Sequence, residues 1–181
     1  MRQDVIIIGG GQQDAALAQR LLEAGKKVLL ICEGRKSEDR SREDFRRAGG
    51  TLLSGDKLSR VEWSEDGSRV EAIYTEGLED TPLRAEAYVL CSGRFFTRGL
   101  LSEEDRVWEP LFGVDVKYLK DSATWCVQDF FSPQPFESFG VIVGEDGKAF
   151  KHGKTIENLY AAGDILCDGT DNLEELCRIL K

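Results

Sequence analysis

The sequence is poor in histidine, and its cysteines are never closely spaced. His152 is the single histidine, and none of the five cysteines forms a Cys-x-x-Cys pair with another. This spacing argues against a zinc site, an iron–sulfur ligand set and a redox dithiol, so no metal site is predicted. We expect the cysteines to be small apolar residues of a core in a reducing cytoplasm.

Basic stripes and long apolar runs are also missing. Lys and Arg total 24 against 33 Asp and Glu, which gives a formal charge of −9. Nucleic acid and anionic membranes are therefore not expected as partners. The apolar run after Asp4 is too short to cross a bilayer, so we expect neither a signal peptide nor membrane insertion. At 181 residues, the chain is expected to form one domain, residues 1–181.

The N-terminal residues have the pattern of a β-α-β unit. A β-branched run over residues 5–8 is typical of a strand buried on both faces of a parallel sheet. Apolar residues then recur at helical spacing from Gln12 to Ala24, and Gly25 follows where a left-handed cap is expected. A second buried strand covers residues 28–32 and ends at Glu33. The predicted fold class is α/β, with a Rossmann-like central parallel sheet.

After this β-α-β unit the spacing of the apolar residues changes. Residues 37–48 predict a charged, solvated helix that ends at Gly49-Gly50. Short strands of period two follow within residues 51–84, and the turn signals between them predict a small antiparallel β-meander. Residues 85–91 resume a buried strand, which stops at Ser92-Gly93.

The C-terminal half returns to the sheet after an irregular stretch. Residues 94–153 lack a sustained period, so we treat them as an excursion containing one strand at 139–143. Residues 159–162 predict a buried strand, and a helix should run from Thr170 or Asp171 to Leu180 with Asp171 as its cap. The core would then comprise residues 1–33, 85–93 and 154–181.

The first chemical signal is a glycine pattern at the first strand–helix junction. It comprises Gly9, Gly10 and Gly11, followed by Gln12, Gln13 and Asp14. Glycines at 9 and 11 permit a tight turn and a close approach of the main chain to a pyrophosphate, whose charge the helix N-terminus meets. Glu33 lies at the tip of the next strand, roughly 20 residues on, where a carboxylate can bind ribose hydroxyls. The pattern predicts a dinucleotide-binding site.

Asp14 conflicts with this pattern, because the third glycine of the fingerprint is expected there. A carboxylate in the first helical turn gains roughly 0.3 to 1 kcal/mol from the helix dipole. Against a phosphate at ~4 Å it would lose about 1 to 4 kcal/mol. We therefore expect Asp14 to weaken cofactor binding, or to occupy the anion site itself in the empty protein.

The second signal is the run from Thr155 to Asp164. An aspartate just past a strand end can bind a polyol hydroxyl, while Gly163 lets a cofactor pass close to the backbone. The run resembles the second flavin motif of two-dinucleotide-binding flavoproteins, in which that aspartate binds the ribityl part of FAD. The pairing of the two motifs favours FAD over NAD. Gly93, which follows the strand predicted at residues 85–91, is a further candidate cofactor-binding residue.

A more specific resemblance comes from two other runs. The run from Cys91 to Leu101, with Asp105-Arg106 and residues 109–112 after it, resembles the B subunit of anaerobic glycerol-3-phosphate dehydrogenase, as does the run from Gly153 to Ala161. The resemblance implies a Rossmann-like FAD-binding fold and an oxidoreductase subunit that passes electrons towards a quinone through partner subunits. It also implies a cytoplasmic protein, held peripherally to the inner membrane by those partners. The chain has no room for the long middle region that covers the flavin in related proteins.

Two other functions remain open. The chain could be a non-catalytic structural relative whose cofactor site Asp14 impairs. For the partners, a homo-oligomer is the alternative to other subunits of a dehydrogenase complex. It could also be a small NAD-dependent reductase that uses Glu33 for the adenosine ribose, which would leave Gly163-Asp164 unexplained. No catalytic residue is predicted, because the only histidine, His152, falls in a turn and is expected at the surface.

Two residue pairs follow the buried strand predicted at residues 85–91. Guanidinium groups at Arg94 and Arg98 suit phosphate or carboxylate, and they follow a strand end where sites gather in α/β sheets. Salt bridging or packing of the excursion would explain them equally well. Phe95 and Phe96 are expected to anchor residues 94–153 in the core rather than to stack on a flavin.

Overall fold

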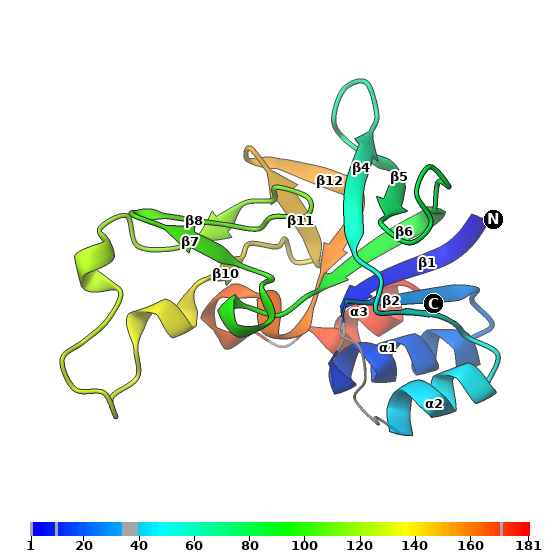
Figure 1. Cartoon of the computed structure of the whole chain (residues 1–181), viewed down its shortest axis with the longest axis horizontal. Coiled ribbons are helices and arrows are strands. Elements are labelled where there is room, and N and C mark those ends of the chain that lie inside the picture. The colour runs from blue at the N-terminus through cyan, green and yellow to red at the C-terminus, as the bar shows by residue number, and fades with distance from the viewer. Residues whose placement is uncertain (1, 10, 34–39, 171) are drawn as a thin grey trace.

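A mostly parallel six-stranded sheet carries the fold (Figure 1). The computed structural model describes residues 2–9, 11–33, 40–170 and 172–181, and for Gln12 the backbone alone. Neighbouring strands are parallel except for the last pair at one edge, which is antiparallel. In spatial order the strands are β11 (Lys148–Lys151), β12 (Lys154–Ala161), β6 (Arg84–Cys91), β1 (Arg2–Gly9), β2 (Val28–Cys32) and β3 (Thr51–Ser54).

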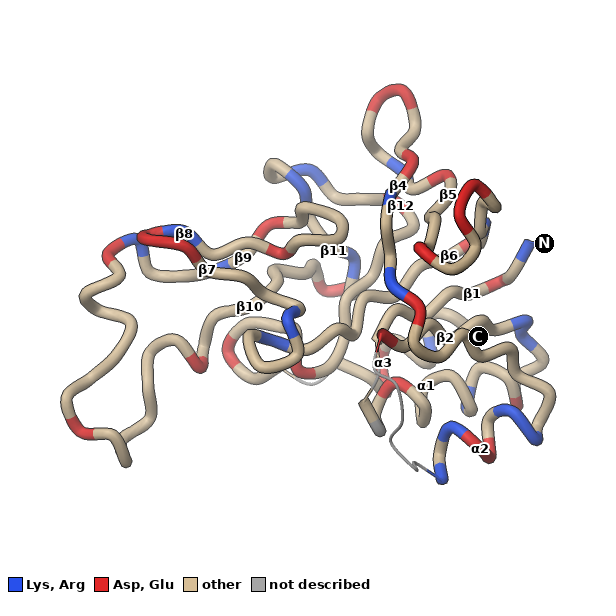
Figure 2. The backbone as a smooth tube through the Cα atoms, viewed as in Figure 1, with Lys and Arg blue, Asp and Glu red and all other residues tan. Residues whose placement is uncertain are grey.

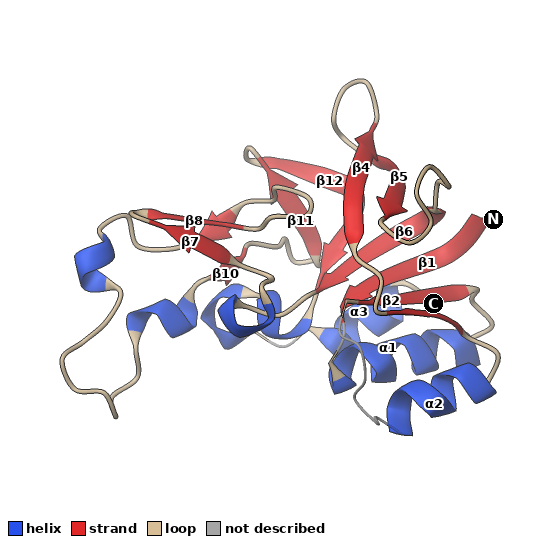
Figure 3. Ribbon diagram, viewed as in Figure 1, coloured by secondary structure: helices blue, strands red, loops and turns tan. Residues whose placement is uncertain are grey.

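Three helices cover one face of this sheet: α1 (Gln12–Glu23), α2 (Arg40–Arg47) and α3 (Leu173–Ile179) (Figure 3). Alternate side chains of β1 point to opposite faces, as a pleated strand requires. Val5 and Ile7 belong to the apolar cluster under the helices. Ile6 and Ile8 belong to the cluster on the other face, under the hairpins and the excursion. Both faces of the central strand are therefore buried, which explains its continuous apolar run.

Helix α1 ends in the glycine cap that the sequence predicts. Gly25 adopts a left-handed backbone with φ 85°. The Gly25 N–H donates to the Leu22 carbonyl, and the Lys26 N–H donates to the Leu21 carbonyl. These two bonds form a Schellman motif, which satisfies carbonyls at the end of the helix and turns the chain into β2.

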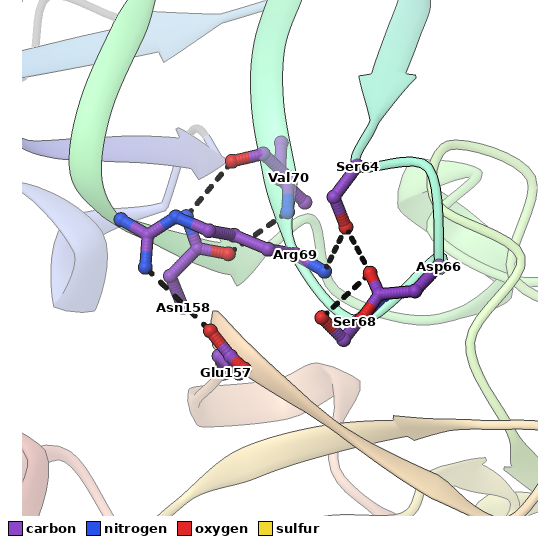
Figure 4. Close-up of polar contacts among 7 residues, drawn as sticks. All are labelled: Ser64, Asp66, Ser68, Arg69, Val70, Glu157 and Asn158. Carbon is purple, nitrogen blue, oxygen red and sulfur yellow. Dashed lines mark hydrogen bonds and ion pairs between the residues drawn. The ribbon is translucent and has the colours of Figure 1, made fainter.

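The antiparallel hairpin β4 (Leu58–Trp63) and β5 (Val70–Thr75) packs on the face opposite the helices. The buried side chain of Asn158 joins this hairpin to the main sheet (Figure 4). The Val70 N–H donates to Asn158 Oδ1, and Asn158 Nδ2 donates to the Val70 carbonyl, both over 2.9 Å. Because Asn158 is 3% exposed, it acts as an additional peptide group that pairs β12 with β5.

The turn of this hairpin is organised around Asp66 (Figure 4). Its Oδ1 accepts hydrogen bonds from the hydroxyl of Ser64 and from both the hydroxyl and the backbone N–H of Ser68. These donors favour the charged carboxylate and lower the pKa of Asp66 to about 2. The turn between β4 and β5 is thus closed by the side chains of Ser64, Asp66 and Ser68.

The excursion leaves the sheet after β6 and extends away from it (Figure 1). It is shorter than the expected residues 94–153, because Lys148–Lys151 forms β11 of the main sheet. Its short strands form two pairs, namely β7 (Leu101–Glu103) with β8 (Arg106–Trp108) and β9 (Val116–Lys117) with β10 (Gly140–Val141). Between β9 and β10, residues 118–139 form an arm with two short 3-10 turns. Figure 2 shows acidic and basic positions interspersed along the backbone.

The structure corrects several expectations. Thr51–Ser54 is not part of the meander, because it pairs in parallel with β2 as a strand of the main sheet. The strand expected at 139–143 is confined to Gly140–Val141. The final helix begins at Leu173 with Asn172 as its cap residue, and Asp171 lies outside the described residues, as do residues 37–39 of the charged helix.

The expected core position of the cysteines is confirmed for Cys32, Cys91 and Cys177. It is wrong for Cys126, which is exposed, while Cys167 is half-buried. Within the described part of the chain, no helix is long and apolar enough to cross a membrane.

Candidate dinucleotide site

A cavity of about 570 Å³ opens where β1, β2 and β6 end. The carboxyl ends of parallel strands meet at one edge of a sheet, so the loops that follow them converge there. This volume lies within the usual range of ligand pockets, roughly 300 to 1,000 Å³. The lining residues are Ile8, Gly9, Gly11, Gln13, Asp14, Glu33, Arg42, Cys91, Ser92, Gly93, Thr97, Arg98, Leu111 and Asp164.

The structure brings most of the predicted site residues together in this cavity. The residues that line it are Gly9, Gly11, Gln13, Asp14, Glu33, Gly93 and Asp164. Gly163 adjoins them, because a Cβ built on it would lie 3.2 Å from Gln13 Oε1. Gln12 is the first residue of α1, and Gly10 lies outside the described residues. Two segments about 150 residues apart thus share one cavity, while the role of each residue stays a prediction.

Asp14 turns back towards the glycine loop. The Gly11 N–H donates to Asp14 Oδ2 over 2.7 Å, and the Asp14 residue is only 4% exposed. This contact is half of a capping box, in which the third helical residue accepts the N–H of the cap residue. The other half is impossible, because Gly11 has no side chain. The Asp14 carboxylate therefore accepts a backbone N–H at the helix N-terminus, where anions bind.

The neighbours of Asp14 are packed closely around its carboxylate. A Cβ built on Gly9 would lie 2.4 Å from Asp14 Oδ2 and 2.8 Å from the Cys91 carbonyl oxygen, so only glycine fits at position 9. Burial, and then the charge and hydrogen bond of Asp14, raise the pKa of the Cys91 thiol well above its usual value. Cys91 consequently stays a protonated thiol at neutral pH and is not an activated nucleophile.

Arg94 holds the second motif in place through hydrogen bonds to backbone carbonyls. Its Nε donates to the Asp164 carbonyl over 2.6 Å, and its Nη2 donates to the Leu166 carbonyl over 3.2 Å. Its Nη1 donates to the carbonyl of Glu137 in the excursion. The guanidinium therefore ties the loop after β6 to the turn after β12 and to the arm, which is the packing role left open by the sequence.

Arg98 and Arg42 line the cavity together with the predicted residues. Arg98 was one of the two arginines singled out by sequence. Arg42 was missed, because a charged helix predicts solvated side chains, yet this residue is 8% exposed. Its spacing of three from the buried Phe45 places both on the inner face of α2, which was the available signal.

The expectations for the aromatic pair and for the histidine have different outcomes. Phe95 packs against the apolar core as expected. The expectation for Phe96 is wrong, because this side chain is 98% exposed. His152 is an exposed turn residue between β11 and β12, as predicted, and its backbone N–H donates to Asp115.

The chain has the Rossmann-like fold of FAD-binding proteins, with a cavity at the carboxyl ends of its parallel strands. Residues 33–179 match the family model described as FAD binding domain, and the chain belongs to this family. It is also homologous to the B subunit of anaerobic glycerol-3-phosphate dehydrogenase. The identity is 37% with the protein of Pectobacterium atrosepticum and 40% with that of Actinobacillus succinogenes, over 92% and 75% of this chain.

The chain spans 40% and 32% of the length of these two relatives. The solved structure of PqsL from P. aeruginosa, in complex with 2-aminobenzoylacetate, overlaps 51% of this chain and 43% of that one. Its identity is 14% and its TM-score is 0.42. The assignment to the family therefore rests on the sequence match over residues 33–179 and not on this structural similarity.

Proposed function

We propose that the chain is an FAD-binding oxidoreductase unit of the same type as the B subunit of anaerobic glycerol-3-phosphate dehydrogenase. The observation that supports this most is the shared cavity, in which the glycine loop, Glu33 and Asp164 line one space of about 570 Å³. A turn glycine, an acidic residue at a strand tip and an aspartate after a second strand are the groups that a flavin dinucleotide needs.

Each of these groups has a distinct part in the proposed binding. The glycine loop and the N-terminus of α1 meet the pyrophosphate, and Glu33 accepts hydrogen bonds from ribose hydroxyls. Asp164 accepts hydrogen bonds from the ribityl chain, and Gly93 and Gly163 allow close passage beside the backbone. Bound FAD would supply a two-electron acceptor to this site.

The residues present fit this cofactor, with one adjustment at Asp14. The cavity has the size and the acidic groups for the sugar parts of a dinucleotide. The Gly11 N–H, however, already donates to Asp14 Oδ2. Because a pyrophosphate would compete with this carboxylate, we propose that FAD binds more weakly here than it would with a glycine at this position.

Turnover is proposed to depend on other subunits. The relatives are named as one subunit of a dehydrogenase, and this chain spans less than half of their length. No histidine is among the residues described as lining the cavity, since the single histidine, His152, is exposed in the turn between β11 and β12. We therefore propose a cytoplasmic unit, brought to the inner membrane by partners, that passes electrons towards a quinone.

The first experiment is an absorption spectrum of the purified protein before and after FAD is added, followed by gel filtration. Flavin bands that stay with the protein support the proposal. Glu33→Ala and Asp164→Ala should each weaken FAD binding by roughly 1.5 to 3 kcal/mol, because each removes a charge-assisted hydrogen bond. Unchanged affinity in both variants would refute the proposed site.

The hydrogen bond between Gly11 and Asp14 also supports a second candidate, a structural relative with an impaired cofactor site. This protein would stay colourless with FAD, and its melting temperature would not respond to the cofactor. Asp14→Gly would then be the variant expected to restore binding. An NAD-dependent reductase has less support, because it gives Asp164 no role; a thermal shift with nicotinamide dinucleotides would favour it.

A further inference from the structure

A second cavity of about 350 Å³ adjoins the dinucleotide cavity. The two cavities meet at Gly93, Thr97 and Asp164, which line both. Asp164, proposed above for the ribityl chain, therefore stands at the junction. Beyond it the lining combines the charged residues Arg94 and Glu137 with three aromatic residues, Phe95, Phe96 and Phe136.

Phe96 has an unusual environment in this second cavity. Its side chain is 98% exposed, although exposing an aromatic ring to water is unfavourable. Its neighbour Phe95 packs into the core and meets Phe136 edge to face, with ring centroids 6.2 Å apart. The same 3-10 turn, Phe95–Thr97, thus buries one ring and presents the next one to solvent at the cavity rim.

The loop that carries Phe96 is held firmly. The Gly99 N–H donates to the Arg94 carbonyl over 2.9 Å, and the Arg98 N–H donates to the Phe95 carbonyl over 3.1 Å. A Cβ on Gly99 would lie 2.0 Å from the Gly93 carbonyl oxygen, so the loop closes tightly on itself. Arg94 fastens it to the carbonyls of Asp164 and Leu166. The backbone that carries the exposed ring is therefore held in place, which lowers the entropy that the loop would lose on binding.

We propose that Phe96 is a stacking residue for the planar ring system of the bound flavin. This inference rests on the proposed function and extends it by one residue and one cavity. The dinucleotide would run from Glu33 past Asp164, and its isoalloxazine ring would enter the second cavity against the face of Phe96. An exposed aromatic ring offers an apolar, planar surface of this kind, and stacking on it gains free energy without hydrogen bonds.

The test compares binding of FAD with binding of ADP, which lacks the ring. Phe96→Ala is predicted to weaken FAD binding about 5-fold to 150-fold, the range of stacking on an aromatic side chain, and to leave ADP affinity unchanged. The fluorescence of the bound flavin should rise when the stacking partner is removed. Phe96→Tyr should restore both properties.

Phe130→Ala is the matched control. Phe130 is also strongly exposed, at 84%, but it lies in the arm and lines neither cavity. This variant should bind FAD like the wild type. Because both side chains are exposed, neither substitution should lower the melting temperature.

The outcomes separate this inference from the proposed function. If Phe96→Ala binds FAD as tightly as the wild type does, the stacking role is overturned while the dinucleotide site stands. The role is also overturned if the wild type binds FAD no more tightly than ADP. If the wild type binds neither ligand, the proposed function itself fails and the stacking role fails with it.

Discussion

Replacement of Asp14 by glycine should tighten the binding of FAD. The Gly11 N–H that donates to Asp14 Oδ2 over 2.7 Å lies at the helix N-terminus, where the pyrophosphate is proposed to bind. A phosphate accepting the same N–H would bring its charge to roughly 4 Å from the carboxylate, at a cost of about 1 to 4 kcal/mol. Removing this repulsion corresponds to a gain of about 5-fold to 1,000-fold in affinity.

Two further variants test whether the charge of Asp14, rather than the shape of its side chain, weakens FAD binding. Asp14→Asn removes the charge but keeps an oxygen that can accept the Gly11 N–H, so its affinity should fall between those of the wild type and Asp14→Gly. Glu23→Gln changes the net charge equally at the exposed far end of α1 and should leave the affinity unchanged.

Calorimetric titration with FAD and with ADP measures these affinities, since both ligands carry the pyrophosphate. Asp14→Gly should also lower the free energy of unfolding by about 1 to 2 kcal/mol, because it removes the hydrogen bond to Gly11 and adds a glycine to the helix. Equal dissociation constants in Asp14→Gly, Asp14→Asn and the wild type would refute the electrostatic reasoning.

Two predictions concern the hairpin that packs on β12. Asn158→Ala should lower the free energy of unfolding by about 2 to 4 kcal/mol in denaturant titrations, because it leaves the N–H and C=O of Val70 without buried partners. Glu157→Ala removes only an exposed ion pair with Arg69, so it should cost at most about 1 kcal/mol, and an equal loss in both variants would contradict the bridging role of Asn158. The lowered pKa of Asp66 predicts that wild type is more stable than Asp66→Asn above about pH 4 and that this advantage disappears as the pH falls to about 2. A pH-independent difference in melting temperature would contradict the ionised state of this carboxylate.

The elements predicted correctly are those fixed by local pattern. The first β-α-β unit has continuous strand runs, helical spacing and a glycine at the cap, and each signal agrees with the others. The prediction for Thr51–Ser54 is wrong because its two leucines do not indicate whether the strand pairs in parallel or antiparallel. Whether such a short strand joins a hairpin or the edge of a parallel sheet depends on contacts far away in the sequence.

The candidate site was largely predictable for a topological reason. Residues at the carboxyl ends of parallel strands meet at one edge, so the loops after residues 8, 32 and 91 had to converge. Side-chain direction was not predictable to the same degree. Phe95 and Phe96 are adjacent in a 3-10 turn, and the sequence does not specify which ring faces the core.

Because β6 and β12 are neighbours in the sheet, the segment that connects them can vary independently of the sheet. The chain leaves the sheet after Cys91 and re-enters it at Lys148, and β6 and β12 pair in parallel although the excursion separates them in the sequence. The entropy of closing such a loop grows slowly with its length, so the intervening segment can be lengthened or shortened at small cost. Selection can therefore remodel the surroundings of the cavity while the strand ends that shape it keep their register.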